Sequence, residues 1–67
     1  MLTNKIKEYR EKQNITQQEI ADLTDVRRET ISRLEQNKYN PSLELAMKIA
    51  YYLNVSVEEL FNWEKDQ

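Results

Sequence analysis

The chain has 67 residues, of which 33% are charged, and a net charge of −2. A chain of this length has room for one small domain, which excludes a multidomain organisation. Cysteine and histidine are absent, so disulfides, thiol or imidazole catalysis and Cys/His zinc sites are excluded as well. We therefore expect a single domain over residues 1–67 with no metal and no cofactor, and an enzyme is the least favoured class.

The sequence contains no run that approaches the roughly 20 apolar residues of a membrane span, and its first residues lack the apolar region of a signal peptide. We therefore expect a cytoplasmic protein with no membrane partner. Nothing indicates an effector domain, so no small-molecule effector is expected either.

The charge is unevenly distributed along the chain. Residues 27–38 carry four basic and two acidic side chains, whereas residues 39–67 carry two basic and five acidic ones. A compact basic stretch in an acidic chain indicates one face that attracts an anion, although ordinary surface charge would explain the same counts. The overall acidity argues weakly against nucleic-acid binding, because such proteins are usually basic.

Helical periodicity predicts short helices whose boundaries are marked by capping residues. A first helix follows a cap at Thr3 or Asn4 and ends about Gln13. Thr16 and Glu19 can form a capping box, which predicts that a second helix starts at Gln17. The side chains expected to face the core from this second helix are Ile20, Ala21 and Leu23.

The third predicted helix extends from about residue 27 to residue 36. A turn of three or four residues precedes it, because the second helix ends near Thr24 and Asp25 tolerates a turn or left-handed conformation. The outer face of this third helix is polar and cationic. Its inner face is expected to consist of Thr30, Ile31 and Leu34.

A fourth helix is predicted after Pro41, because proline disfavours the helical conformation at Asn40 and Ser42 can cap the following residues. Asn54 is a stop signal at its end. The stripe expected to face the core consists of Leu43, Ala46, Ile49, Ala50 and Leu53.

A second capping box, at Ser56 and Glu59, opens a short fifth helix. This helix is expected to bury Leu60 and Phe61 before an exposed tail. The sequence therefore predicts an all-α fold of five helices with almost no strand.

The second and third helices together form a helix-turn-helix pattern, with the small Ala21 where the two helices cross. Any two short helices satisfy this pattern loosely. The side chains on the outside make it more specific, because arginine can bind guanine through two hydrogen bonds and glutamate can accept one from cytosine. These side chains are Gln17, Arg28, Glu29 and Arg33.

Several stretches of the chain follow a known family pattern. They are ITQQEIA at residues 15–21, VRRETISRLE at 26–35, NKYNPSLEL at 37–45, AMKIAYYL at 46–53 and VSVEELF at 55–61. In these stretches the chain resembles the Cro/cI-type (Xre) DNA-binding domains, and it is similar to small stand-alone members such as the repressor of a cytolysin operon. The resemblance implies a five-helix fold of the lambda-repressor type, and it allows a short antiparallel sheet between residues 1–5 and 62–65.

The resemblance also implies a sequence-specific repressor or activator, with a repressor favoured, that binds a near-palindromic operator as a homodimer. The third helix would enter the major groove, while other side chains would contact phosphates and fix the register. The implied base-facing residues are Arg28, Glu29 and Arg33, with Arg27 and Thr30 beside them. The implied phosphate contacts are Gln17, Gln36, Asn37, Lys38 and Asn40, and Gln17 would also brace the third helix.

Two positions depart from the family pattern. Asp25 stands where the family usually has glycine, and we expect some backbone strain there. Arg27 stands where a serine or threonine usually caps the third helix, which removes a cap worth about 1 kcal/mol and adds a cation.

The family pairs an arginine on the first helix with a glutamate at the end of the third, which here are Arg10 and Glu35. We interpret both as a structural ion pair rather than as functional charges. Loss of one partner of such a pair is strongly destabilising.

Aromatic side chains near the end of the chain are candidates for a dimer surface, since exposed large apolar groups often mark interfaces. Packing inside one subunit is the alternative. The residues expected at the dimer interface are Tyr51, Tyr52, Asn54, Val55, Val57 and Trp63.

A second functional class remains open at the level of the sequence. The same fold could serve as a protein-interaction module, in the manner of an antitoxin or co-regulator, with weak or non-specific DNA binding. The acidic balance slightly favours this class.

Overall fold

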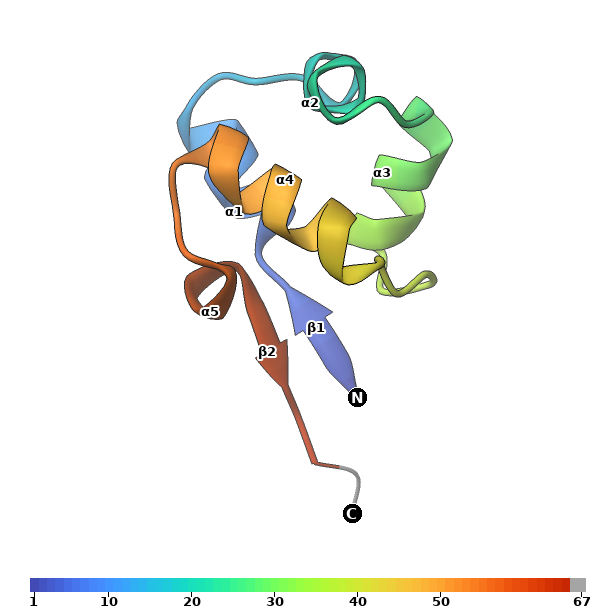
Figure 1. Ribbon diagram of the computed structural model, residues 1–67, viewed down its shortest axis with the longest axis vertical. Helices are drawn as coiled ribbons and strands as arrows, with labels where there is room; N and C mark the ends of the chain where they lie inside the picture. Colours follow the sequence, from blue (N-terminus) through green and yellow to red (C-terminus); the bar gives the residue numbers. More distant parts are fainter. Residues whose placement is uncertain (66–67) are drawn as a thin grey trace.

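The computed structural model describes residues 1–65, which form five helices and two short strands. The expected fold of five helices with a small terminal sheet is confirmed. The elements in chain order are β1 (Leu2–Asn4), α1 (Ile6–Lys12), α2 (Gln17–Thr24), α3 (Arg28–Glu35), α4 (Leu43–Leu53), α5 (Val57–Leu60) and β2 (Phe61–Trp63), as Figure 1 shows.

Helix α2 begins where the capping box predicts. The Thr16 hydroxyl accepts a hydrogen bond from the Glu19 backbone N–H at 3.0 Å, and the Glu19 carboxylate accepts one from the Thr16 N–H at 2.9 Å. Hydrogen bonding of the Glu19 carboxylate, first to the Thr16 backbone N–H and then to the Thr16 side chain, lowers the pKa of Glu19 from its ordinary value of 4.5. The same arrangement at Ser56 and Glu59 starts α5.

The chain has no glycine, so other residues occupy the left-handed backbone conformation that ends its helices. Asn14, Asp25, Asn37 and Asn54 all have φ angles between 56° and 60°. Asparagine and aspartate tolerate this region better than other non-glycine residues. The turn between α2 and α3 therefore forms at Asp25 despite the missing glycine.

The first helix begins later than predicted, at Ile6, because Asn4 belongs to strand β1. The Asn4 side chain nevertheless accepts a hydrogen bond from the Ile6 N–H at 3.1 Å. Asn4 therefore satisfies one amide of the first turn while Lys5 occupies the capping position.

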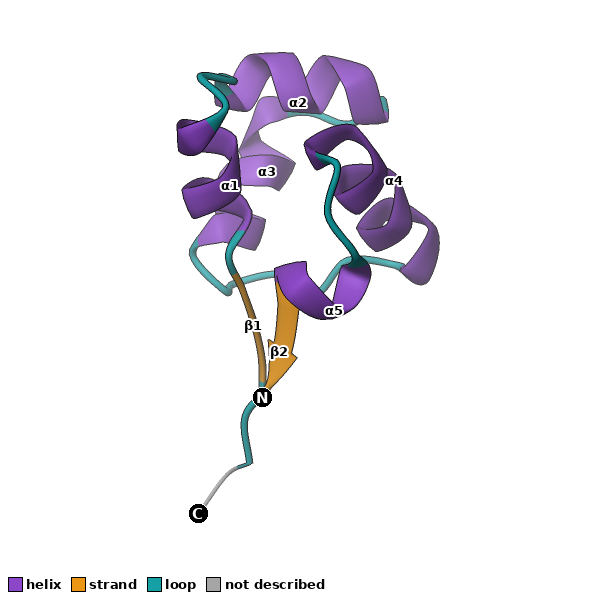
Figure 2. Cartoon of the chain, turned by 90° about the vertical axis from the view of Figure 1, so that its left-hand side faces the viewer, coloured by secondary structure: helices purple, strands orange, loops and turns teal. Residues whose placement is uncertain are grey.

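Strands β1 and β2 pair in antiparallel register, with Leu2 opposite Trp63 and Asn4 opposite Phe61. Figure 2 shows the two strands side by side at one end of the helical part. The tail predicted after α5 is exposed from Asn62 to Lys65 as expected, although part of it also pairs with the N-terminal segment, and the last two residues of the prediction, Asp66 and Gln67, lie outside the described residues. Phe61 is half-buried and lies in β2 rather than in α5.

The core lies between the helices and contains seven fully buried large side chains: Ile6, Ile20, Ile31, Leu34, Ile49, Leu53 and Leu60. Two of the residues predicted to face the core do not do so. Leu23 is 47% exposed and Leu43 is 73% exposed. Each lies at the edge of its helix's apolar stripe, where spacing alone does not decide which neighbour packs inward.

Two other residues take the places predicted for Leu23 and Leu43. In α2, Thr24 is buried together with Ile20 and Ala21, and its hydroxyl donates a hydrogen bond to the Ile20 carbonyl oxygen at 2.7 Å. In α4, Leu45 is buried in addition to the predicted core residues from Ala46 to Leu53, and it is only 8% exposed. Burial of the Thr24 hydroxyl is tolerated because its donor is satisfied within the helix.

Candidate nucleic-acid interface

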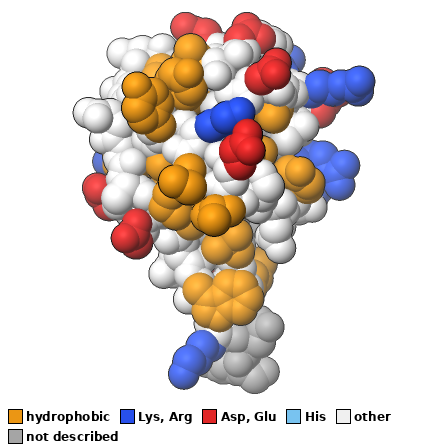
Figure 3. Space-filling model, viewed as in Figure 1, with side chains coloured by type: hydrophobic (Ala, Val, Ile, Leu, Met, Phe, Trp, Pro, Cys, Tyr) orange, Lys and Arg blue, Asp and Glu red, His pale blue; other side chains and the backbone are white. Residues whose placement is uncertain are grey.

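The outer face of α3 carries three exposed charged side chains, Arg28, Glu29 and Arg33. Together with Ser32 they line one shallow hollow on the surface. Figure 3 shows basic side chains projecting on the side of the molecule where α3 lies in Figure 1. Thr30 is half-buried, so it lies beside this face and partly against the core.

Arg27 occupies the capping position of α3 in an extended conformation. Within residues 1–65, no side chain makes a capping hydrogen bond at this helix start. The first turn is closed instead by the Thr30 N–H, which donates to the Arg27 carbonyl oxygen at 3.0 Å. The Arg27 side chain is exposed next to Arg28 and adds positive charge at the start of the helix.

Arg10 of α1 and Glu35 of α3 form a buried ion pair. The Arg10 Nε donates to Glu35 Oε2 at 2.8 Å, and the Arg10 Nη2 donates to Glu35 Oε1 at 3.2 Å. The two side chains are only 9% and 5% exposed. The hydrogen bond to Glu35 raises the pKa of Arg10 above its already high ordinary value, so the guanidinium stays charged.

Gln17, the first residue of α2, connects this buried pair to the outer face of α3. Its Nε2 donates to Glu35 Oε1 at 3.0 Å, and its Oε1 accepts from the Arg28 Nε at 3.4 Å. Gln17 is half-buried and Arg28 is exposed. The Gln17 side chain therefore bridges the N-terminus of α2 to both ends of α3.

The segment after α3 is polar and exposed, and it contains Gln36, Asn37, Lys38 and Asn40. The Lys38 N–H donates to the carbonyl oxygen of Arg33 at 2.9 Å, which fixes the start of this segment against the helix. The Asn37 side chain accepts a hydrogen bond from Asn4 at 3.1 Å, so its oxygen is already engaged within the molecule. Gln36 donates to the Ser32 hydroxyl at 3.1 Å.

The residues expected at a dimer interface fall into two groups. Tyr51, Tyr52, Asn54 and Val55 line one hollow at the end of α4, and the two tyrosine rings meet edge to face at a centroid distance of 5.1 Å. Trp63 lies apart from them on β2 and is 70% exposed.

The valines in this set are partly engaged inside the subunit. Val55 and Val57 are half-buried against the core. The two valines therefore fit the alternative, packing inside one subunit, whereas the aromatic residues are exposed and remain candidates for the dimer interface.

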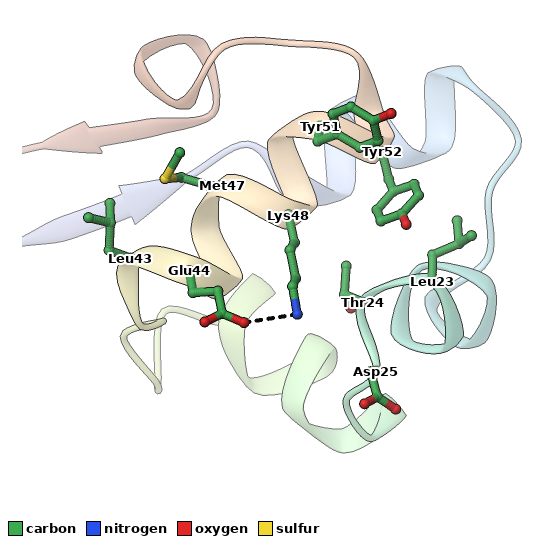
Figure 4. A pocket seen from close by; sticks show the side chains of 9 residues that line it. All are labelled: Leu23, Thr24, Asp25, Leu43, Glu44, Met47, Lys48, Tyr51 and Tyr52. Carbon is green, nitrogen blue, oxygen red and sulfur yellow. Dashed lines mark ion pairs between the residues drawn. The ribbon is translucent and has the colours of Figure 1, made fainter.

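Sequence reasoning missed an apolar groove of about 650 Å³ between the end of α2 and the exposed side of α4. Figure 4 shows Leu43 and Met47 projecting from α4 near one end and Tyr52 near Leu23 at the other. Glu44 and Lys48 form an ion pair in it at 3.0 Å, which raises the pKa of Lys48. The remaining lining residues are Thr24, Asp25 and Tyr51.

A signal for this groove was present in the sequence. Leu43, Met47 and Tyr51 recur at intervals of four and are 73%, 56% and 76% exposed. Residues four apart share one face of a helix, so the three form a second apolar stripe on α4. Figure 3 shows apolar side chains gathered on this face of the molecule.

Across residues 1–65, no three acidic side chains lie close enough together to hold a metal ion. Within the same residues, none of the helices has the length and apolarity needed to cross a membrane.

Comparison with known proteins identifies the family. The helix-turn-helix family model (HTH_3) matches residues 6–60. Two archaeal proteins named "Uncharacterized HTH-type transcriptional regulator" align over 66 residues, or 98% of this chain. The one from Archaeoglobus fulgidus is 48% identical with 93% of its length covered, and the one from Methanocaldococcus jannaschii is 44% identical with 100% covered.

A solved structure gives the same result at the level of the fold. The crystal structure of a "putative DNA-binding protein" from Bacteroides fragilis matches with a TM-score of 0.85 at 35% identity, covering 92% of this chain and 100% of that one. The residues matched by the family model include Gln17, Arg28 and Glu35. This chain therefore belongs to the helix-turn-helix family of the Cro/cI (Xre) type, a family of DNA-binding transcriptional regulators rather than of enzymes.

Proposed function

We propose that the chain is a sequence-specific repressor that binds a near-palindromic operator as a homodimer, as do the small stand-alone repressors that its sequence resembles. The observation that carries the proposal is the exposed face of α3, where Arg28, Glu29 and Arg33 surround one hollow. With α3 in the major groove, the arginines would donate to guanine and the glutamate would accept from cytosine.

The surroundings of α3 fit contacts to the DNA backbone. Arg27 and Thr30 would lie beside the base-reading side chains. The polar segment directly after α3 is exposed and would hold phosphates without reading sequence. The proposed phosphate-contacting residues are Gln17, Gln36, Asn37, Lys38 and Asn40.

The homodimer would form through the exposed aromatic residues near the end of α4 and on β2. In a dimer of this kind the two α3 helices lie about one DNA turn, ~34 Å, apart, so half-site centres are separated by ~10 base pairs. The proposed interface consists of Tyr51, Tyr52, Asn54, Val55, Val57 and Trp63.

Selection of binding sites from a random duplex pool at about 0.15 M salt tests the proposal, since salt sets how much non-specific binding survives. We expect enrichment of a palindrome with that half-site spacing. Binding without any enriched sequence would overturn the assignment as a base reader. An enriched site without two-fold symmetry would overturn the homodimer.

Three variants separate base reading from backbone contact. Arg28→Ala should cost ~1 to 3 kcal/mol on the selected site and flatten the preference at one position of each half-site. Lys38→Ala should weaken binding about equally on all sequences, because a phosphate contact carries no sequence information. Lys7→Ala removes the same charge from the exposed side of α1 and serves as the control.

A second function is favoured by one observation, the apolar groove between α2 and α4. Its exposed Leu23, Leu43 and Met47 could bind another protein, which would make the chain an interaction module with weak DNA binding. Failure of the selection experiment, together with retained folding, would favour this alternative.

A further inference from the structure

The C-terminal end of α3 is joined by hydrogen bonds to strand β1, which lies at the start of the chain. The side-chain nitrogen of Asn4 donates to the Leu34 carbonyl oxygen at 2.8 Å and to Asn37 Oδ1 at 3.1 Å. Asn4 belongs to β1, Leu34 lies in the last turn of α3, and Asn37 lies just beyond that helix. One side chain of the terminal sheet therefore contacts the segment that is proposed to hold phosphates.

The backbone at the end of α3 has the form of a Schellman motif. Asn37 has a φ angle of 58°, and its N–H donates to the Leu34 carbonyl oxygen at 3.0 Å. The Lys38 N–H donates to the Arg33 carbonyl oxygen at 2.9 Å. These hydrogen bonds fix the point where the Asn37 side chain leaves the backbone, but they do not determine which end of its amide faces outward.

The contacts of Asn4 determine the orientation of the Asn37 amide. The Asn4 oxygen accepts from the Ile6 N–H at 3.1 Å, and a backbone N–H can only donate. The Asn4 nitrogen faces the Leu34 carbonyl oxygen, which can only accept. The same nitrogen therefore offers its second hydrogen to Asn37, which turns its oxygen inward to accept it. The amide nitrogen of the exposed Asn37 is then left to donate outward.

The outward donors matter because of the direction of the α3 dipole. The carbonyl oxygens at the C-terminal end of a helix carry a partial negative charge, which repels a phosphate. Donors from Asn4 and from the backbone already occupy the Arg33 and Leu34 carbonyl oxygens. A phosphate near Asn37 meets further donors only if the amide nitrogen of Asn37 faces outward.

We propose that Asn4 is a positioning residue for Asn37 and orients the Asn37 amide so that it donates to a DNA phosphate. This inference rests on the proposed function, because it assumes that Asn37 contacts a phosphate. It adds that a residue of the terminal sheet contributes to DNA affinity through a contact inside the protein.

The variant Asn37→Gly tests the phosphate contact alone. Glycine adopts a φ angle near 58° readily, so the backbone of the motif is kept while the amide is lost. We expect the Kd to rise about threefold to tenfold for each half-site, the range that corresponds to one net hydrogen bond. The rise should be the same on the selected site and on random DNA, since a phosphate contact carries no sequence information.

The variant Asn4→Ser tests the positioning role without a change of charge. The serine hydroxyl can still accept from the Ile6 N–H, but it is one atom shorter and cannot reach Leu34 and Asn37 together. We expect a smaller rise in Kd than for Asn37→Gly. In the free protein, ¹⁵N relaxation should show the order parameter of the Asn37 side-chain amide falling below about 0.6, the range of flexible groups.

The variant Asn4→Asp reverses the direction of the contact. A carboxylate can only accept, so the Asn37 nitrogen turns inward to donate to it and the Asn37 oxygen faces the phosphate. We therefore expect a larger rise in Kd than for Asn37→Gly. Urea denaturation of each variant gives its folded fraction, and the Kd values are compared per folded protein.

Two controls remove the effect of the added charge. Asn62→Asp makes the same change at an exposed position of β2, where the backbone oxygen and not the side chain accepts from Thr3. When Asn37→Gly is already present, Asn4→Asp should raise the Kd no more than Asn62→Asp does, because the amide that it reorients is gone.

Equal effects of Asn4→Asp with and without the Asn37 side chain would overturn the positioning role while the proposed function stands. A wild-type order parameter of the Asn37 amide in Asn4→Ser would also overturn it, and this measurement involves no DNA. If Asn37→Gly leaves the Kd unchanged, Asn37 does not hold a phosphate, and its assigned contact and this inference fall together, although base reading by α3 is unaffected.

Discussion

Arg10→Met should destabilise the protein by about 3 kcal/mol, because it leaves Glu35 as a buried carboxylate without its cation. The Glu35 side chain is 5% exposed and keeps only the hydrogen bond from Gln17, so the lower part of the known range for broken buried pairs applies. A domain of 67 residues has a total stability of about 3 to 10 kcal/mol. The substitution therefore removes a large part of the stability.

Thermal and urea denaturation followed by circular dichroism measure the effect. A loss of this size corresponds to a decrease in Tm of about 12 to 24 °C for so small a domain. The control is Lys48→Met, which breaks the exposed ion pair with Glu44 and should leave the Tm almost unchanged.

A double variant separates the loss of the attraction between the two charges from the cost of leaving one charge buried without a partner. Replacing both partners, with Arg10→Met and Glu35→Leu, should recover most of the stability, because no charge is then left buried. A loss below about 1 kcal/mol for the single variant, the scale of a surface ion pair, would refute the reasoning. A double variant as unstable as the single one would refute it as well.

Three further predictions follow from individual contacts. Above pH 4.5 the ionised Glu19 stabilises α2 through its hydrogen bond with Thr16, and this contribution should be lost as the pH falls through the lowered pKa of Glu19 in the folded protein. In urea denaturation, the stability of Glu19→Gln should therefore depend less on pH in this acidic range than that of the wild type. Ser42→Ala should lower the stability by about 1 kcal/mol in thermal denaturation, since the Ser42 hydroxyl caps α4 by accepting from the Leu45 N–H at 3.1 Å, and an unchanged Tm would contradict this. Tyr51→Glu places a charge on a side chain that is 76% exposed, so sedimentation should show monomers without loss of folding, whereas a persistent dimer would place the interface elsewhere.

The helix boundaries that could be predicted are those set by neighbouring residues. Thr16 with Glu19 starts α2 through contacts three residues apart, and Asp25 and Asn54 end helices through their own backbone conformation. These signals depend only on neighbouring residues, so they can be recognised in the sequence without knowledge of the tertiary structure. The charged outer face of α3 was predictable for the same reason, because helical periodicity alone separates Arg28 from the core.

The features that were missed depend on partners far away in the sequence. Phe61 leaves the fifth helix because Asn4, at the other end of the chain, pairs with it in the sheet. Leu23 and Leu43 are exposed because neighbours decide which edge of an amphipathic stripe is covered. The hydrogen bonds that join Gln17 to Glu35 and Arg28 also arise from the packing of α2 on α3, so the bracing role of Gln17 came from the family resemblance and not from spacing within either helix.

The acidic balance of the chain gives these short-range contacts more weight in the proposed function. A net charge of −2 provides little general attraction to DNA, and only four of the ten basic residues, Arg27, Arg28, Arg33 and Lys38, lie in or next to α3. Each phosphate neutralised contributes about −0.9 to the slope of log K against log salt, so a protein with few such contacts should show a shallow slope and weak binding to random DNA. Most of its affinity for an operator must then come from hydrogen bonds to bases, whose strength depends on the orientation of the donors. A chain of this composition therefore depends more on its contacts to bases than a strongly basic protein would. A steep salt slope together with strong binding to random DNA would contradict this argument, because the phosphate contacts would then supply the affinity without help from positioned side chains.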